Sequence, residues 1–178
     1  MSSHYEIHDN FLEEDYFKQL YDIVLHSGSF TWLYQENVAK HVDSVNDDVN
    51  QFYFVAPIFD ALEPKDPFHG VLQPLYYQLK VAGLIRSRMI MYTNTDKIIE
   101  HSPHRDMTFS HTAALLYMNT NNGYTRFKND DGGWDKVESI ANRLVIHDGS
   151  HLHGSTTCTD QKKRIVLAIN YFVGEPED

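Results

Sequence analysis

Two histidines and one aspartate are the residues of this chain whose types and spacing could do chemistry. His104 and Asp106 lie two positions apart, so their side chains point to the same side of an extended segment. His153 follows much later, after the turn-like sequence Gly149-Ser-His. Two imidazoles and one carboxylate suit non-haem Fe(II), because they leave coordination positions open. These three residues are therefore the predicted metal ligands and the predicted catalytic centre.

Composition alone explains part of this signal. Eleven His and sixteen Asp in 178 residues give roughly one His-x-Asp triplet by chance. A second copy does occur, at His41-Val42-Asp43. Only His104 stands at the head of a β-rich half that carries a later histidine and an arginine. That context favours the triplet at 104–106.

The second histidine ligand has competitors. His147, His151 and His153 share the same parity on an extended chain. We expect His153 to be the ligand, while His151, His147 or a three-histidine cupin-like site stay open alternatives. His101 and His111 flank the motif, and we expect solvated strand-end histidines there.

An arginine after His153 could bind the co-substrate. Arg164 comes eleven residues after His153 and opens the apolar segment 165–172. A dicarboxylate co-substrate that chelates iron at one end needs its distal carboxylate neutralised, and a guanidinium does this with two parallel hydrogen bonds. We therefore predict Arg164 as the anchor, in preference to Lys162 and Lys163.

The elements that must position these residues change type along the chain. Apolar residues at helical spacing predict an amphipathic helix over 17–25, and a second helix is expected from Asp66-Pro67 to Gly83, kinked or shortened by Pro74. Short strands are expected around 30–34 and 51–55. Beyond Gly83 the apolar segments are short and separated by turn residues, which favours an antiparallel sandwich or barrel. These segments are 84–92, 113–119, 123–127, 144–147 and 164–172.

Charge and composition exclude several classes of protein. The net charge of −10 at pH 7 disfavours nucleic acid as a partner, and no apolar run is long enough for a membrane span. Cys158 is the only cysteine, so no internal disulfide can form, and the first residues lack signal-peptide features. We expect a single domain over 1–178 that works in the cytoplasm.

The combination of His104-x-Asp106, His153 and Arg164 resembles the signature of the 2-oxoglutarate- and Fe(II)-dependent dioxygenases, in their prolyl 4-hydroxylase-like branch. The resemblance covers roughly residues 84–173 and is greatest to small stand-alone members from phages and bacteria.

That resemblance also implies further contacts with the co-substrate. It makes Tyr92 and Tyr117 the tyrosines that bind 2-oxoglutarate beside Arg164. Many relatives carry a hydroxyl residue two places after the arginine, where this chain has Val166. Asn170 shares the face of Arg164 if the strand is regular, and is a further pocket candidate.

The family likeness further implies a fold and a reaction. The fold would be mainly β with flanking helices: a double-stranded β-helix (jelly roll, cupin-like) over 84–173, with 1–83 as a helical and loop buttress. Fe(II), 2-oxoglutarate and dioxygen would couple oxidative decarboxylation to hydroxylation of a peptidyl residue, most simply proline. The alternatives are a free amino acid or small metabolite as substrate, or a cupin-like metal-binding module without 2-oxoglutarate. The sequence indicates neither the oligomeric state nor a need for ascorbate.

Overall fold

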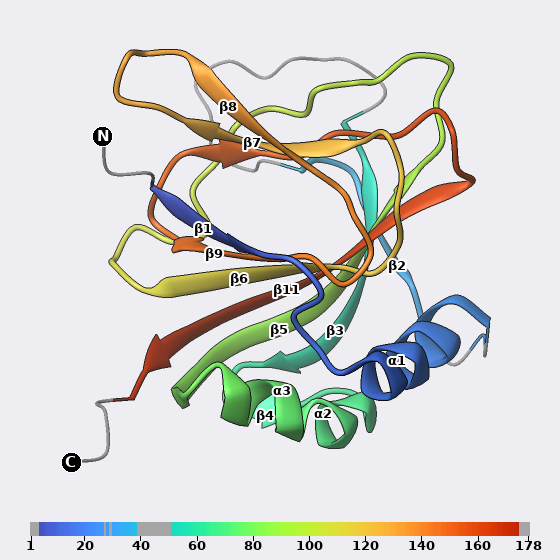
Figure 1. The fold of residues 1–178 in the computed structure, drawn as a ribbon, viewed down its shortest axis with the longest axis vertical. Helices are drawn as coiled ribbons and strands as arrows, with labels where there is room; N and C mark the ends of the chain where they lie inside the picture. The colour runs from blue at the N-terminus through green and yellow to red at the C-terminus, as the bar shows by residue number, and fades with distance from the viewer. Residues whose placement is uncertain (1–3, 27, 29, 39–50, 175–178) are drawn as a thin grey trace.

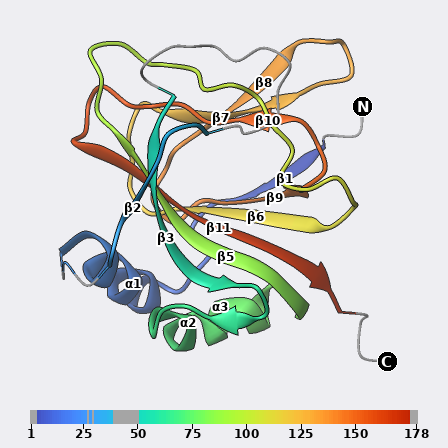
Figure 2. The same cartoon turned by 180° about the vertical axis from the view of Figure 1, so that it is seen from behind.

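Two antiparallel sheets dominate the computed structural model, which describes residues 4–26, 28, 30–38 and 51–174 (Figure 1). The large sheet has the order β1-β9-β6-β11-β5-β3-β2, with β4 paired to β3, and the small sheet has the order β10-β7-β8. Figure 2 shows β10 beside β7 in the small sheet. The strands are β1 Tyr5–His8, β2 Leu33–Gln35, β3 Tyr53–Asp60, β4 Glu63–Pro64, β5 Val81–Thr93, β6 Thr112–Tyr117, β7 Tyr124–Lys128, β8 Trp134–Glu138, β9 Leu144–Asp148, β10 His153–Gly154 and β11 Lys163–Val173.

The five strands predicted beyond Gly83 are all present as β5, β6, β7, β9 and β11. The long strand β11 lies at the centre of the large sheet: Val166 pairs with Ile90 of β5 on one side and with Tyr117 of β6 on the other. The short strands expected around 30–34 and 51–55 correspond to β2 and β3, while β1 and β4 were not expected. Strands β1, β2 and β3 precede Gly83 and extend both edges of the same sheet.

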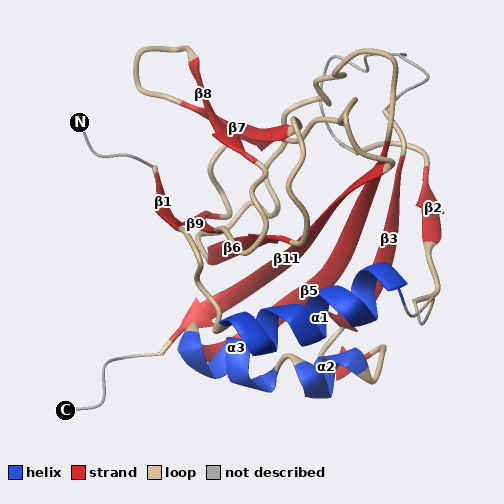
Figure 3. Cartoon of the chain, turned by 45° about the vertical axis from the view of Figure 1, so that its right-hand side comes forward, coloured by secondary structure: helices blue, strands red, loops and turns tan. Residues whose placement is uncertain are grey.

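The helices cover one face of the large sheet (Figure 3). The helix predicted over 17–25 is confirmed as α1 Glu14–His26. The second predicted helix is wrong in length, because the structure has two short helices, α2 Phe68–Val71 and α3 Gln73–Gln78. Pro74 lies in the first turn of α3, and Lys80 takes a left-handed φ of 54° just before β5 begins. No helix in the part of the chain that the structure describes is long and apolar enough to cross a membrane.

The large sheet has buried residues on both of its faces. Alternate residues of a strand point to opposite sides, so each strand contributes side chains to both layers. On the outer face, Met89 and Leu167 pack with the helices. On the inner face, Ile90 and Val166 pack with Phe127 of the small sheet. Even-numbered residues from Arg86 to Tyr92 of β5 and from Arg164 to Asn170 of β11 therefore point into the space between the two sheets, which is the face that carries the predicted site.

Candidate metal centre and active site

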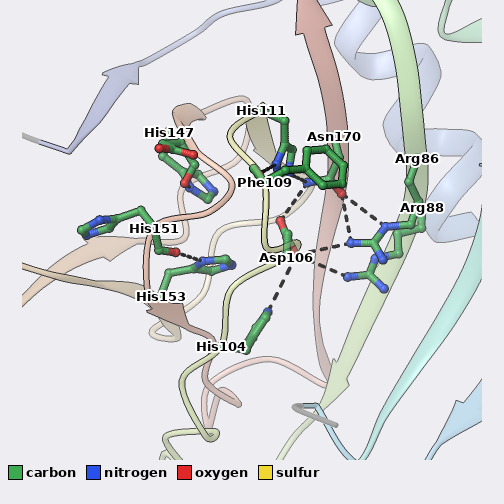
Figure 4. Close-up of polar contacts among 11 residues, drawn as sticks. Arg86, Arg88, His104, Asp106, Phe109, His111, His147, His151, His153 and Asn170 are labelled. Atoms are coloured by element: carbon green, nitrogen blue, oxygen red, sulfur yellow. Dashed lines mark hydrogen bonds and ion pairs between the residues drawn. The ribbon is translucent and has the colours of Figure 1, made fainter. Parts of the chain in front are cut away.

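The structure brings the three predicted ligands together. His104 and Asp106 lie on the segment after β5, and His153 lies on β10. The backbones of His104 and His153 exchange two hydrogen bonds, of 2.7 and 3.0 Å, which hold the two imidazoles on the same side. One donor atom from each of His104, Asp106 and His153 lies within 4.8 Å of the other two, and this is the metal-type cluster found among the described residues (Figure 4). The competing triplet at 41–43 lies outside the described residues.

A hydrogen bond outside the cluster orients His153. Its Nδ1 lies 2.9 Å from the carbonyl oxygen of His151, so Nδ1 carries the proton and donates it to that oxygen. The lone pair is then on Nε2. Metal-bound histidines usually donate their second ring N–H to a carbonyl or carboxylate in this way. The backbone at His151 therefore fixes the tautomer of His153 that can bind a metal.

The protonation states also suit a metal. Burial and, to a smaller extent, the neighbouring His153 lower the pKa of His104 to about 3, although Asp106 acts in the opposite direction. Burial alone would raise the pKa of Asp106, but His153, Arg88, His104 and Arg86 together hold it well below its ordinary value. At neutral pH the cluster therefore offers a neutral imidazole and an ionised carboxylate, which are the forms that bind metal ions.

A chain of hydrogen bonds fixes the carboxylate of Asp106. The side-chain nitrogen of Asn170 donates to Oδ2 of Asp106 at 2.8 Å and lies 3.1 Å from Nε2 of His111. His111 donates from Nδ1 to the carbonyl of Phe109 at 3.0 Å, so its Nε2 accepts. The side-chain oxygen of Asn170 accepts from Nε and Nη2 of Arg86, at 3.2 and 3.1 Å. Every polar atom of the Asn170 side chain is thus used, and the amide has one possible orientation.

The competing histidines take other roles in the structure. Nε2 of His151 lies 2.6 Å from the carbonyl oxygen of Lys128, which directs this ring away from the cluster. His147 is buried beside His153 with ring centroids 4.8 Å apart, and burial lowers its pKa to about 3. His147 is nevertheless outside the group whose donor atoms lie within 4.8 Å of one another. The geometry favours His153 as the second histidine.

The expectation that His101 and His111 are solvated is wrong. His101 is fully buried, and its Nδ1 lies 2.9 Å from the hydroxyl of Ser155. His111 is 5% exposed and belongs to the chain of hydrogen bonds behind Asp106. Sequence patterns place both residues beside the motif but say nothing about what covers them.

Arg164 lies in the protein interior with only 1% of its surface exposed. Its Nε donates to the hydroxyl of Ser139 at 2.7 Å, its Nη2 to the hydroxyl of Thr125 at 3.0 Å, and its Nη1 to the carbonyl of Thr156 at 3.3 Å. A guanidinium has five N–H groups. Its hydrogen bonds to the described residues therefore leave donors for a bound carboxylate.

Tyr92 and Tyr117 flank this guanidinium. The centre of the Arg164 guanidinium lies 5.3 Å from the ring of Tyr92 and 5.5 Å from that of Tyr117, and the Tyr117 hydroxyl donates to Thr125 at 2.8 Å. Burial raises the pKa of both tyrosines, although the charge of Arg164 opposes it. The hydroxyls beside Arg164 come from Thr125 and Ser139, whereas the position two places after Arg164, where the resemblance implied a hydroxyl residue, is Val166. Both lie far from Arg164 in the sequence, so no local motif could indicate them.

The metal-type cluster opens onto a cavity of about 610 Å³. His104 and Asp106 line it together with Arg86 and Arg88 of β5 and residues of β2 and β3. Arg164 is absent from the described lining, in agreement with its burial. Arg86 and Arg88 share the parity of Tyr92 on the predicted strand 84–92, but neither was among the predicted site residues.

No protein-family model matches this chain, and no curated protein matches it by sequence. Solved structures do match it. A prolyl-4-hydroxylase from Pseudomonas putida superposes with a TM-score of 0.64 at 14% identity, over 97% of this chain and 95% of that one. A prolyl hydroxylase from Trichoplax adhaerens, in complex with a hypoxia inducible factor peptide, gives 0.63 at 14%, over 96% and 84%.

A third similar structure has a different ligand. HygX from Streptomyces hygroscopicus, with nickel, 2-oxoglutarate and hygromycin B bound, gives a TM-score of 0.60 at 8% identity, over 96% of this chain and 83% of that one. At these identities the likeness concerns the fold. The predicted double-stranded β-helix is confirmed.

Proposed function

We propose that this protein is a 2-oxoglutarate- and Fe(II)-dependent oxygenase that hydroxylates a C–H bond of its substrate. One observation carries the proposal: a double-stranded β-helix brings single donor atoms of His104, Asp106 and His153 to within 4.8 Å of one another at the edge of a cavity. Two imidazoles and one carboxylate suit Fe(II), and three protein ligands leave positions for a co-substrate.

The surroundings of the three ligands also fit a metal ion. The tautomer of His153 is fixed by the His151 carbonyl, and the Asp106 carboxylate is held by Asn170. Such contacts behind the ligands orient them and add to metal affinity. When bound there, Fe(II) and 2-oxoglutarate would supply the oxidising chemistry, in which dioxygen is consumed, 2-oxoglutarate becomes succinate and carbon dioxide, and the substrate gains a hydroxyl group.

Residues of this chain would bind 2-oxoglutarate and exclude water from it. Arg164 would neutralise the distal carboxylate of 2-oxoglutarate with the N–H groups that Ser139 and Thr125 leave over. The neutral phenols of Tyr92 and Tyr117 flank that position and exclude water from it. Asp106 stays ionised and its neighbour His104 stays neutral over the physiological range, so neither needs to lose a proton before it binds the metal.

For the substrate we propose a prolyl residue or a proline-like amino acid. Two of the similar structures are prolyl hydroxylases, one of them with a peptide, and a third holds the small molecule hygromycin B. The substrate would enter the cavity of about 610 Å³ beside His104 and Asp106. That volume is in the range of ordinary small-molecule sites and fits one amino-acid residue with its neighbours.

The rival function is a cupin-like metal-binding module that does not use 2-oxoglutarate. Such a module would have no reason to bury a guanidinium at the position of Arg164. A buried cation is costly unless an anion or several hydrogen bonds compensate it. The burial of Arg164 with donors left over therefore supports the oxygenase.

The test is succinate formation from 2-oxoglutarate by the Fe(II)-loaded protein in air, compared with the His104→Ala and Arg164→Met variants. We expect slow succinate release without substrate, its loss in His104→Ala, and a KM for 2-oxoglutarate raised on the order of 100-fold in Arg164→Met, because a charge-assisted pair is lost. Equal succinate release by wild type and Arg164→Met would favour the cupin-like module.

A further inference from the structure

Two arginines of β5 point into the cavity beside the metal-type cluster. Arg86 and Arg88 share the inner face of β5 with Ile90 and Tyr92, and Figure 4 shows both guanidinium groups directed toward Asp106. Nη2 of Arg86 lies 3.4 Å from Oδ1 of Asp106, and Nη2 of Arg88 lies 3.7 Å from the same atom. Oδ1 is also the oxygen that lies 3.9 Å from Nε2 of His104. Two cations therefore surround the carboxylate oxygen that faces the metal position.

The two arginines differ in what they bind. Arg86 donates from Nε and Nη2 to the side-chain oxygen of Asn170, so it belongs to the hydrogen-bonded network behind Asp106. Arg88 has only the long ion pair with Asp106, and its Nε is buried without a hydrogen-bond partner among the described residues. Arg88 therefore has more unpaired donors at the cavity wall than Arg86, whose Nε and Nη2 are both hydrogen-bonded.

A bound metal ion would leave the charge of Arg88 less well compensated. Asp106 then shares its negative charge with the ion, and its attraction for Arg88 weakens. A guanidinium that is mostly buried needs a counter-charge or hydrogen bonds to offset its lost hydration. Asp60 also lines the cavity, but its described contact is electrostatic and falls on Arg86. Apart from Asp106, no carboxylate in the part of the chain that the structure describes forms an ion pair with Arg88.

We propose that Arg88 binds a carboxylate of the substrate. This inference rests on the proposed oxygenase function and names the substrate class for the same site. A guanidinium pairs with a carboxylate through two parallel hydrogen bonds. An internal peptide residue has no such group, whereas a free amino acid or a C-terminal residue has one close to its reactive carbons. A prolyl substrate with a free carboxylate satisfies both proposals.

The overall charge of −10 does not oppose an anionic substrate, because the local field decides binding in a cavity. Arg86, Arg88 and Arg105 line the cavity together with Asp60 and Asp106. With a divalent ion on the cluster, and with dianionic 2-oxoglutarate paired to Arg164, these described residues keep an excess of positive charge. The substrate carboxylate would reduce it.

A direct test uses acetate as the probe and acetamide as its neutral match. Mn(II) replaces Fe(II) in the protein with 2-oxoglutarate bound, and the paramagnetic relaxation of the methyl protons of each probe is measured by NMR. Acetate held by Arg88 would sit near the metal, so we expect its relaxation to exceed that of acetamide several-fold. The excess should disappear in Arg88→Met, return in part in Arg88→Lys, and persist in the control Lys18→Met, where an exposed charge on α1 is removed.

Two results would overturn the inference. One is equal relaxation of acetate and acetamide in the wild type. The other is an acetate excess that survives in Arg88→Met, because acetate would then bind the metal or another cation. Each protein is first checked for 2-oxoglutarate binding. If the wild type fails this check, the oxygenase proposal fails; if only Arg88→Met fails it, Arg88 binds the co-substrate and the inference is wrong.

Succinate release during turnover then distinguishes a free amino acid from a C-terminal residue as the source of the substrate carboxylate. Succinate release is compared for free proline, for a peptide with a C-terminal proline, and for the amide of each. Stimulation by an acid but not by its amide identifies the source and supports the inference. Equal stimulation by acid and amide would contradict it. For the active acid we expect Arg88→Met to raise KM on the order of tenfold, with the KM for 2-oxoglutarate unchanged.

Discussion

The side-chain amide of Asn170 donates a hydrogen bond of 2.8 Å to Oδ2 of Asp106, although 64 positions separate the two residues. Asn170 lies on β11, in the middle of the large sheet, and Asp106 lies on the segment after β5. The bond turns the other carboxylate oxygen, Oδ1, toward His104. A rigid strand therefore sets the direction of a ligand that comes from a loop.

Removing this amide should weaken metal binding. In Asn170→Ala the carboxylate of Asp106 loses its fixed donor, and we expect affinity for Fe(II) or Mn(II) to fall about 10- to 100-fold, as for other contacts behind metal ligands. Isothermal titration with Mn(II) measures this. Asn94→Ala, which removes an exposed amide bonded to the Gln161 carbonyl, is the matched control. An unchanged affinity in Asn170→Ala would show that Asp106 needs no support.

The choice among the three histidines can be tested in the same titration. We expect His153→Ala to abolish Mn(II) binding, because one of three ligands is lost. His147→Leu and His151→Ala should keep an affinity within a few-fold of the wild type, since neither residue belongs to the donor group. A loss in His147→Leu as large as that in His153→Ala would make His147 a ligand and the site a three-histidine one.

Much of this site could be predicted because its signals are local. His104 and Asp106 share a side of an extended segment, and Arg164 opens a strand whose apolar run is visible in the sequence. Asn170 could be placed on the face of Arg164 by parity alone. The strands beyond Gly83 were predictable for the same reason, since alternation and turn residues are properties of neighbouring positions.

What could not be predicted depends on contacts between distant segments. Thr125 and Ser139 reach Arg164 only because β7 and the turn before β9 fold over β11. Arg88 lies beside Asp106 only because β5 ends at the segment that carries the motif. The predicted helix end at Gly83 was wrong, because α3 ends at Gln78 and the left-handed residue Lys80 precedes β5. None of these effects leaves a periodic pattern.

Gly149 should tolerate no side chain. A Cβ at this position would overlap the ring of His111, and the Gly149 carbonyl accepts a 2.9 Å hydrogen bond from the backbone N–H of Asp106. We expect Gly149→Ala to lower the free energy of unfolding by about 1–3 kcal/mol, as overpacking does, and to weaken Mn(II) binding.

Denaturant unfolding measures the first effect. The double variant Gly149→Ala/His111→Ala should recover part of the lost stability, because the overlapping ring is gone. Gly70→Ala is the control, since a Cβ there meets no atom within 4 Å. Stability of Gly149→Ala equal to that of Gly70→Ala would contradict the packing around His111.

Tyr76 should make the protein sensitive to alkali. Burial raises the pKa of its phenol to about 12 in the folded protein, while an unfolded tyrosine ionises near pH 10. Between these values the unfolded chain has lost a proton that the folded chain keeps, so the free energy of unfolding falls as pH rises. Below pH 10 the contribution of Tyr76 is complete.

The variant Tyr76→Phe should therefore lose less stability than the wild type between pH 10 and about 12. Urea unfolding at pH 9 and pH 11 measures the difference. Tyr77→Phe is the neighbouring control, because Tyr77 is 88% exposed. Equal alkaline losses in Tyr76→Phe and the wild type would show that the buried phenol does not control this behaviour.

The most direct measurement of the central claim is an anaerobic titration with Fe(II) and 2-oxoglutarate, followed by the weak visible charge-transfer band of the chelate. We predict that the band forms in the wild type and is lost in His104→Ala. In Arg164→Met it should need far more 2-oxoglutarate, because the distal carboxylate loses its partner. Metal binding without any band in the wild type would contradict the oxygenase and support a cupin-like metal-binding module.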